Sequence, residues 1–348
     1  MNFVNERRFH PNRWTRDLFE RYEPKYGFDR WGSESFDSWQ EQFRDELESA
    51  LGLPVIEEDG PHDLAAKEID SEERYDHIRQ KWVVRTERDF YVPFYLLLPD
   101  DPDDSLPVVI AVHGHGENGK ETYVGRYETD DQRLAISEGE RDVGLQAVRR
   151  GYAAIVPDMR GFGELSNVED QEAGRGTCRT MQMHAQLFGR SLVGERVWDV
   201  SRLVDFVEGR PELDSDRIAI TGNSGGGTVS LFAAAVDERI SLSAPSSYFC
   251  TFEDSIASIH HCECNYVPGV ARLGELSDVA GLIAPRPFLA IAGADDPIFP
   301  IDGTRRAFDA LREIYEAAGA AGACELYVGS GGHRYYADGA WPFIDERL

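Results

Sequence analysis

The sequence predicts an α/β fold with a mostly parallel central sheet that is covered by helices on both faces. From residue 106 onward, short apolar segments alternate with segments of helical period, which is typical of a parallel sheet. The segments 106–112 and 152–156 are continuously apolar, as expected for strands with two buried faces. The segment 217–227, RIAITGNSGGG, passes from a strand pattern through a glycine-rich turn into a helix pattern.

We expect about eight strands, with an antiparallel strand at the N-terminal edge. Residues 81–99 fit two antiparallel strands joined near residues 87–89. The remaining elements are expected as helices near 140–150, 193–207 and 307–315, and as strands at 152–156, 218–220, 239–244, 286–292 and 324–328. Three long insertions, near 117–142, 164–185 and 246–275, are expected to shape a pocket, and 164–185 shows no regular pattern.

Residues 1–78 are expected to form a helical extension packed on the main domain, residues 79–348. Five apolar residues fall at helical spacing: Phe36, Trp39, Phe43, Leu47 and Leu51. Gly52 and Pro54 then end the predicted helix. No strand pattern is visible before about residue 75.

Charge and composition narrow the classes of partner. The chain of 348 residues has a net charge of −27, so nucleic acid and anionic membranes are not expected as partners. Its 4 lysines against 32 arginines fit adaptation to high salt, or the codon bias of a GC-rich genome. The first residues are charged and do not resemble a secretory signal. The sequence has no apolar run long enough to suggest a membrane span. The five cysteines, which do not form a disulfide pattern, fit a reducing compartment. We therefore expect a cytoplasmic protein.

Ser224 has the surroundings of a catalytic nucleophile. It lies between Gly222 and Gly226 in a G-x-S-x-G motif, with a strand before it and a helix after it. A serine on such a sharp turn needs small neighbours on both sides so that the strand and the helix can approach each other. An ordinary glycine-rich turn is the alternative.

Two further strand ends carry the partners that a serine nucleophile needs. A serine hydroxyl requires a base to accept its proton and an acid to orient that base. Asp295 and Asp296 follow the strand at 286–292, and His333 follows the last strand. The carboxyl ends of parallel strands meet at one edge of a sheet, so Ser224, one aspartate and His333 are expected to lie together.

A second glycine-rich turn, residues 113–116 with sequence HGHG, follows the strand at 106–112. Such a turn can direct backbone N–H groups into a cleft, where they would stabilise an oxyanion. We expect the backbone N–H groups of His115 and Gly225 to be these donors. A two-histidine metal site or a plain turn would give the same pattern.

Several long segments resemble the α/β-hydrolase superfamily, and more narrowly its acetyl-xylan-esterase-like, dienelactone-hydrolase-related branch. They are VHGHG at 112–116, GRSLVGERVWDV at 189–200, GNSGGGT at 222–228, CECNYVPG at 262–269 and LIAPRPFLAIAGADDPIFP at 282–300. The resemblance implies an α/β-hydrolase fold and a serine esterase that acts through an acyl-enzyme on a small ester, such as an acetylated sugar. It also implies that Asp296 is the catalytic acid, with Asp295 as the alternative. No cofactor is expected.

The insertion 246–275 carries His260, His261, Cys262, Cys264 and Tyr266. Zinc was considered for these residues, but C-x-C lacks a second pair of ligands and adjacent histidines rarely share one metal. We therefore expect no metal, and we expect His260, His261 and Tyr266, together with His113, to line the pocket.

Two other functions are compatible with the same motifs. One is a serine peptidase of the prolyl-oligopeptidase kind, although the residues before the sheet are too few for a β-propeller. The other is a non-catalytic binding protein on a hydrolase fold. Dienelactone hydrolases would prefer cysteine at position 224, and dehalogenases would prefer aspartate. A small-molecule ester is the expected partner, and the sequence does not indicate an oligomeric state.

Overall fold

The structure is a computed structural model that describes residues 11–32, 35–58, 62–100, 105–116 and 118–348. Residues 1–10, which include most of the charged N-terminal segment, lie outside the described residues. Within the described part of the chain, every helix is too short or too polar to cross a lipid bilayer.

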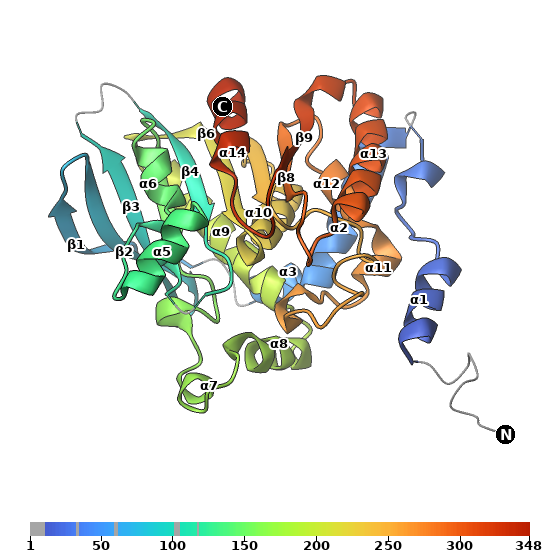
Figure 1. The fold of residues 1–348 in the computed structure, drawn as a ribbon, viewed down its shortest axis with the longest axis horizontal. Helices are drawn as coiled ribbons and strands as arrows, with labels where there is room; N and C mark the ends of the chain where they lie inside the picture. The colour runs from blue at the N-terminus through green and yellow to red at the C-terminus, as the bar shows by residue number, and fades with distance from the viewer. Residues whose placement is uncertain (1–10, 33–34, 59–61, 101–104, 117) are drawn as a thin grey trace.

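A single nine-stranded sheet forms the centre of the molecule (Figure 1). Its strands, in spatial order, are β1 (Lys67–Glu73), β2 (His77–Glu87), β3 (Phe90–Pro99), β5 (Ala153–Pro157), β4 (Leu106–Val112), β6 (Leu213–Asn223), β7 (Leu242–Ser246), β8 (Phe288–Gly293) and β9 (Cys324–Gly329). The strands from β5 to β9 are parallel to one another, whereas β1, β2 and β3 pair in antiparallel fashion and β3 pairs antiparallel with β5. The mostly parallel sheet with an antiparallel N-terminal edge is confirmed, with nine strands instead of about eight.

Helices cover both faces of the sheet, as expected. The described helices are α1 (Pro11–Arg21), α2 (Phe36–Leu51), α3 (Leu53–Glu57), α4 (Lys120–Tyr123), α5 (Asp130–Glu138), α6 (Val143–Val148), α7 (Val168–Glu172), α8 (Thr177–Leu187), α9 (Leu192–Glu208), α10 (Gly225–Val236), α11 (Val270–Leu273), α12 (Leu276–Gly281), α13 (Ile301–Ala317) and α14 (Ala337–Arg347). Helices α9, α10, α12 and α13 share one hydrophobic core with the sheet, whereas α6 and α14 share a second core. Strands β4, β5 and β8 are therefore buried almost throughout.

The N-terminal helix α2 packs on the main domain as predicted. All five apolar residues of its predicted face are buried, and Gly52 ends it in the left-handed conformation at φ 87°. Arg44 and Gln40 fix the helix to the core, since they donate hydrogen bonds to the carbonyl oxygens of Ala235 and Gly281. This helix thus extends the hydrophobic core beyond the sheet and its covering helices.

The expectation of no strand before about residue 75 is wrong. Strand β1 pairs with β2 at the edge of the sheet, and six of its seven residues are exposed. An edge strand without a buried face shows no apolar alternation, so its sequence, KEIDSEE, carried no strand signal.

Each of the three insertions contains short helices. The insertion at 117–142 holds α4 and α5, and the one at 246–275 holds α11 and a short 3₁₀ turn, Glu263–Asn265. Residues 164–185, which showed no regular pattern in the sequence, form α7 and most of α8. Strand β7 begins three residues later than expected, and Arg239, at the start of the predicted strand, forms ion pairs with Asp237 and Asp205 instead.

Candidate active site

Ser224 occupies the sharp turn between β6 and α10, in a strained backbone conformation. Its φ of 57° and ψ of −114° lie where residues other than glycine are rarely found. The backbone N–H of Ser224 donates to the carbonyl oxygen of Ser246 at 2.8 Å, which ties the turn to the end of β7. The strand, turn and helix predicted around this serine are all present.

The glycines of the motif are needed for close packing. A Cβ atom on Gly222 would lie 2.1 Å from the carbonyl oxygen of Val112, and a Cβ on Gly114 would lie 2.6 Å from that of Asn223. These distances are far below van der Waals contact. The glycines therefore allow β4 and the loop after it to approach the turn at Ser224.

His333 and Asp296 form a hydrogen-bonded pair. His333 Nδ1 lies 2.8 Å from Asp296 Oδ2. Since an ionised carboxylate can only accept a hydrogen bond, Nδ1 carries the proton and Nε2 remains free to accept one. Asp296 is 4% exposed, and its other oxygen accepts hydrogen bonds from the backbone N–H groups of Ile298 and Phe299 at 2.8 and 3.1 Å. The neighbouring Asp295 is exposed to solvent.

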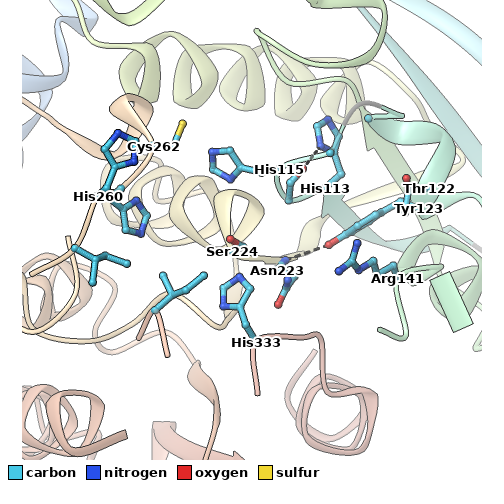
Figure 2. Close-up of a pocket in the computed structure, with 16 residues that line it drawn as sticks. His113, His115, Thr122, Tyr123, Arg141, Asn223, Ser224, His260, Cys262 and His333 are labelled. Atoms are coloured by element: carbon cyan, nitrogen blue, oxygen red, sulfur yellow. Dashed lines mark hydrogen bonds between the residues drawn. The ribbon is translucent and has the colours of Figure 1, made fainter. Parts of the chain in front are cut away.

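Ser224 and His333 lie next to each other at the wall of one cavity (Figure 2). The cavity has a volume of about 320 Å³. It is lined by His113, Gly114, His115, Gly116, Gly119, Thr122, Tyr123, Arg141, Asn223, Ser224, Ile259, His260, His261, Cys262, Ile298 and His333. The carboxyl ends of β4, β6 and β8 supply several of these residues, as expected for a parallel sheet.

The HGHG turn lies directly beside Ser224. A Cβ atom on Gly225 would lie 2.8 Å from the imidazole ring of His115, so the two residues expected to donate to an oxyanion are neighbours. The N–H of Gly225 belongs to the first turn of α10, where backbone N–H groups have no partner within the helix. The His115 side chain and the backbone of Gly225 thus lie close together beside Ser224.

His113 fixes the HGHG turn through hydrogen bonds of its imidazole ring. It is 3% exposed, its Nδ1 lies 2.8 Å from the carbonyl oxygen of Gly114, and its Nε2 accepts from the N–H of Met159 at 3.1 Å. This pattern requires a neutral imidazole with the proton on Nδ1. Burial also lowers the pKa of His113, which keeps the ring neutral.

Three of the four residues expected to line the pocket do so, namely His113, His260 and His261. Tyr266 does not, and this expectation is wrong. Its hydroxyl donates to the carbonyl oxygen of Ile256 at 3.0 Å, and its side chain lines an adjacent groove with Phe19 and Val267. The 3₁₀ turn Glu263–Asn265 directly precedes Tyr266.

Several cavity residues carry no signal in the sequence that predicts their place there, including Thr122, Tyr123, Arg141 and Asn223. The Tyr123 hydroxyl accepts a hydrogen bond from the N–H of Asn223 at 3.1 Å, and burial raises the pKa of this tyrosine far above its ordinary value. Arg141 brings a positive charge to the cavity wall. Tyr123 and Arg141 belong to the insertion at 117–142, which had no motif that would have singled them out.

Four potential metal ligands meet beside the cavity. They are His115, Cys178, Cys262 and Cys264, and their ligand atoms all lie within 4.8 Å of one another. The set differs from the one considered in the sequence, because His260 and His261 are not part of it. Hydrogen bonds from Cys178 and Cys262, assisted by Arg196, lower the pKa of Cys264 well below its ordinary value.

Comparisons with known proteins show what the chain as a whole is similar to. Residues 5–328 match the model described as the Abhydrolase family. YtaP of Bacillus subtilis (strain 168), provisionally named a hydrolase, is 25% identical over 279 residues, which cover 78% of this chain and 87% of YtaP. A 4-O-methyl-glucuronoyl methylesterase of Phanerochaete carnosa (strain HHB-10118-sp) is 26% identical over 196 residues, which cover 49% of this chain and 47% of that protein.

A solved structure confirms the fold. A protein of Bacteroides fragilis NCTC 9343, provisionally titled an acetyl xylan esterase, superposes with a TM-score of 0.76. The alignment covers 92% of this chain and 82% of that chain at 18% sequence identity. The expected α/β-hydrolase fold, with a helical region at its N-terminus, is therefore correct.

Proposed function

The chain belongs to the Abhydrolase family, and on that premise we propose that it is a serine esterase that removes a small acyl group, such as acetyl, from a carbohydrate or similar small ester. The observation that carries this proposal is the hydrogen-bonded pair of the buried Asp296 and the partly exposed His333, beside Ser224. A nucleophile, a base and an acid arranged in this order are what acyl transfer through serine requires.

The reaction follows from the hydrogen-bonding roles of these groups. His333 Nε2 accepts the hydroxyl proton of Ser224 as the serine oxygen attacks the ester carbonyl carbon. Asp296 holds the imidazole and stabilises its protonated form. The backbone N–H groups of His115 and Gly225 stabilise the negative charge on the former carbonyl oxygen, and each such donor typically contributes about 10²–10³ in rate.

The ester bond then breaks, and His333 gives its proton to the departing alcohol oxygen. Water attacks the acyl-serine with His333 again acting as the base, and the carboxylic acid leaves. No part of this reaction calls for a metal or an organic cofactor, because the charge that develops is met by backbone N–H groups and by the protonated imidazole.

The size and lining of the cavity support a small, polar ester. Its volume of about 320 Å³ lies at the lower end of the range for ligand sites, and polar groups such as Arg141 and Thr122 accompany the histidines. The names of the similar proteins, an acetyl xylan esterase and a glucuronoyl methylesterase, support a carbohydrate as the carrier of the ester.

Hydrolysis of p-nitrophenyl esters from acetate to octanoate, in low and in molar salt, tests this proposal. We expect acetate to be the fastest, and we expect Ser224→Ala to lower kcat by about 10⁴-fold or more. Ser49→Ala is the matched control, because that hydroxyl lies on the exposed surface of α2 and donates a hydrogen bond to the carbonyl oxygen of Asp45 in the same helix.

Unchanged turnover in Ser224→Ala would contradict the assignment of the nucleophile. A folded wild-type protein that hydrolyses none of these esters, nor a methyl ester of glucuronic acid, would favour the peptidase or the non-catalytic alternative instead. Short proline-containing peptides then distinguish those two.

A further inference from the structure

The cluster of His115, Cys178, Cys262 and Cys264 is assembled from three separate parts of the chain. His115 follows β4, Cys178 lies in the first turn of α8, and the other two cysteines flank the start of the 3₁₀ turn at Glu263–Asn265. His115 Nε2 lies 3.2 Å from Cys264 Sγ, and Cys262 Sγ lies 3.2 Å from Cys264 Sγ. Two of the three insertions thus converge on the turn beside Ser224.

The spacing of these atoms fits one tetrahedral ion. Zinc binds thiolate sulfur at about 2.3 Å and imidazole nitrogen at about 2.0–2.1 Å, so its ligand atoms lie about 3.5–3.8 Å apart. The four ligand atoms of the cluster lie within 4.8 Å of one another, with two separations of 3.2 Å. To form a tetrahedron, the widest separations would shorten by about 1 Å at most and the two short ones would lengthen by about 0.5 Å or less.

The surroundings suit a charged metal site. Cys178 and Cys264 are 5% and 1% exposed. Arg196, itself 1% exposed, donates a hydrogen bond from Nη2 to Cys178 Sγ at 3.3 Å and is held by two hydrogen bonds to the carbonyl oxygen of Arg160. Three thiolates and one divalent ion carry a net charge of −1, which the guanidinium of Arg196 neutralises.

We propose that His115, Cys178, Cys262 and Cys264 bind one zinc ion in a closed, four-coordinate structural site. Three thiolates and an imidazole form a soft donor set that favours zinc over magnesium or calcium. Binding replaces the thiol protons, which are released to solvent. The ion links α8 and the 246–275 insertion to the HGHG turn, and so fixes the backbone of His115 beside Ser224. This site does not depend on the proposed esterase activity.

The direct test is the metal content of untagged protein, purified under reducing conditions without chelator. We expect about one zinc per chain in the wild type and less than about 0.1 in Cys264→Ser and Cys178→Ser. Cys324→Ser is the matched control, because Cys324 is also buried but lies at the start of β9, outside the cluster. It should keep the full zinc content.

A second measurement covers the case in which a cysteine variant does not fold. Reduced wild-type protein, stripped by a chelator and then titrated with Co²⁺, should show thiolate-to-cobalt charge-transfer bands that saturate at one ion per chain and disappear when zinc is added.

Wild-type protein without zinc, together with no such bands on adding Co²⁺, would overturn the proposal. So would a Cys262–Cys264 disulfide found by mass spectrometry in protein purified under reducing conditions. Because both experiments read metal binding and not turnover, their outcome is separate from that of the esterase assay.

Discussion

Gly226 packs so tightly against β4 that a Cβ atom on it would lie 1.9 Å from the carbonyl oxygen of Val112. This carbonyl belongs to the buried backbone of the central sheet and cannot move away as a flexible side chain could. The position of Ser224 therefore depends on the absence of a side chain two residues after it.

Gly226→Ala is predicted to destabilise the protein by at least about 2 kcal/mol and to reduce esterase activity, because the added methyl group separates α10 from β4. Urea denaturation measures the first effect and ester hydrolysis the second. Gly322→Ala is the control, since a Cβ at position 322 would meet no atom within 4 Å. Equal stability of the two variants would contradict the packing argument.

The two adjacent aspartates of the acid loop should differ sharply in their effect on catalysis. Asp296→Asn is predicted to lower kcat by about 10³–10⁴-fold, because an amide no longer holds the His333 imidazole in the required tautomer. Asp295→Asn should change kcat less than about twofold, because the Asp295 side chain is exposed. Steady-state kinetics of both variants, with circular dichroism to verify folding, checks this. A larger loss in Asp295→Asn would reverse the assignment.

The candidate catalytic residues were predictable from the sequence because they follow strands in local motifs, although the choice of Asp296 over Asp295 came from the family resemblance. Ser224, Asp296 and His333 needed no knowledge of how the insertions fold. Tyr123 and Arg141 could not be found, because their place in the cavity depends on the path of the chain through α4 and α5.

The same limit applies to the cysteine cluster and to Tyr266. His115 and Cys264 are 149 residues apart in sequence. The C-x-C spacing of Cys262 and Cys264 did not by itself point to the two other proposed ligands, His115 and Cys178. Tyr266 was misplaced because nothing in the sequence around it showed that its side chain lines a different groove. The fold could be predicted because apolar residues recur with the period of strands or of helices along the chain. Strand β1 is the exception, since its exposed residues show no such periodicity.

Asp278 should impose a particular pH dependence on stability. Its carboxylate accepts hydrogen bonds from the N–H groups of Phe28 and Glu275, yet burial raises its pKa to about 6 from an ordinary value of 3.8. Because the folded pKa lies above the unfolded one, the folded state binds the proton more tightly. Ionisation of Asp278 therefore lowers the free energy of unfolding as pH rises through about 6.

Asp278→Asn removes this titration. Between pH 4.5 and 7.5, the stability of the variant relative to the wild type should improve by about 2 kcal/mol, since one pKa unit corresponds to about 1.4 kcal/mol. Urea denaturation at the two pH values, in the same salt, measures the difference. A stability difference that is the same at both pH values would contradict this account of Asp278.

The net charge of −27 predicts that salt stabilises the fold. Repulsion among the excess carboxylates weakens as the Debye length falls from about 10 Å at 0.1 M to about 3 Å at 1 M salt. We expect the melting temperature to rise between 0.1 and 2 M KCl. Chloride is preferable to sulfate, because sulfate strengthens apolar burial in any protein. A maximum below about 0.2 M KCl would contradict adaptation to high salt.

The central claim is that Ser224 is the nucleophile, and covalent labelling tests it most directly. A serine-directed fluorophosphonate should modify wild-type protein once, with the adduct mapped by tandem mass spectrometry to Ser224 and with loss of ester hydrolysis in proportion to labelling. Labelling should be absent in Ser224→Ala and much slower in Asp296→Asn. An adduct on another residue, or no adduct on protein that hydrolyses esters, would contradict the account.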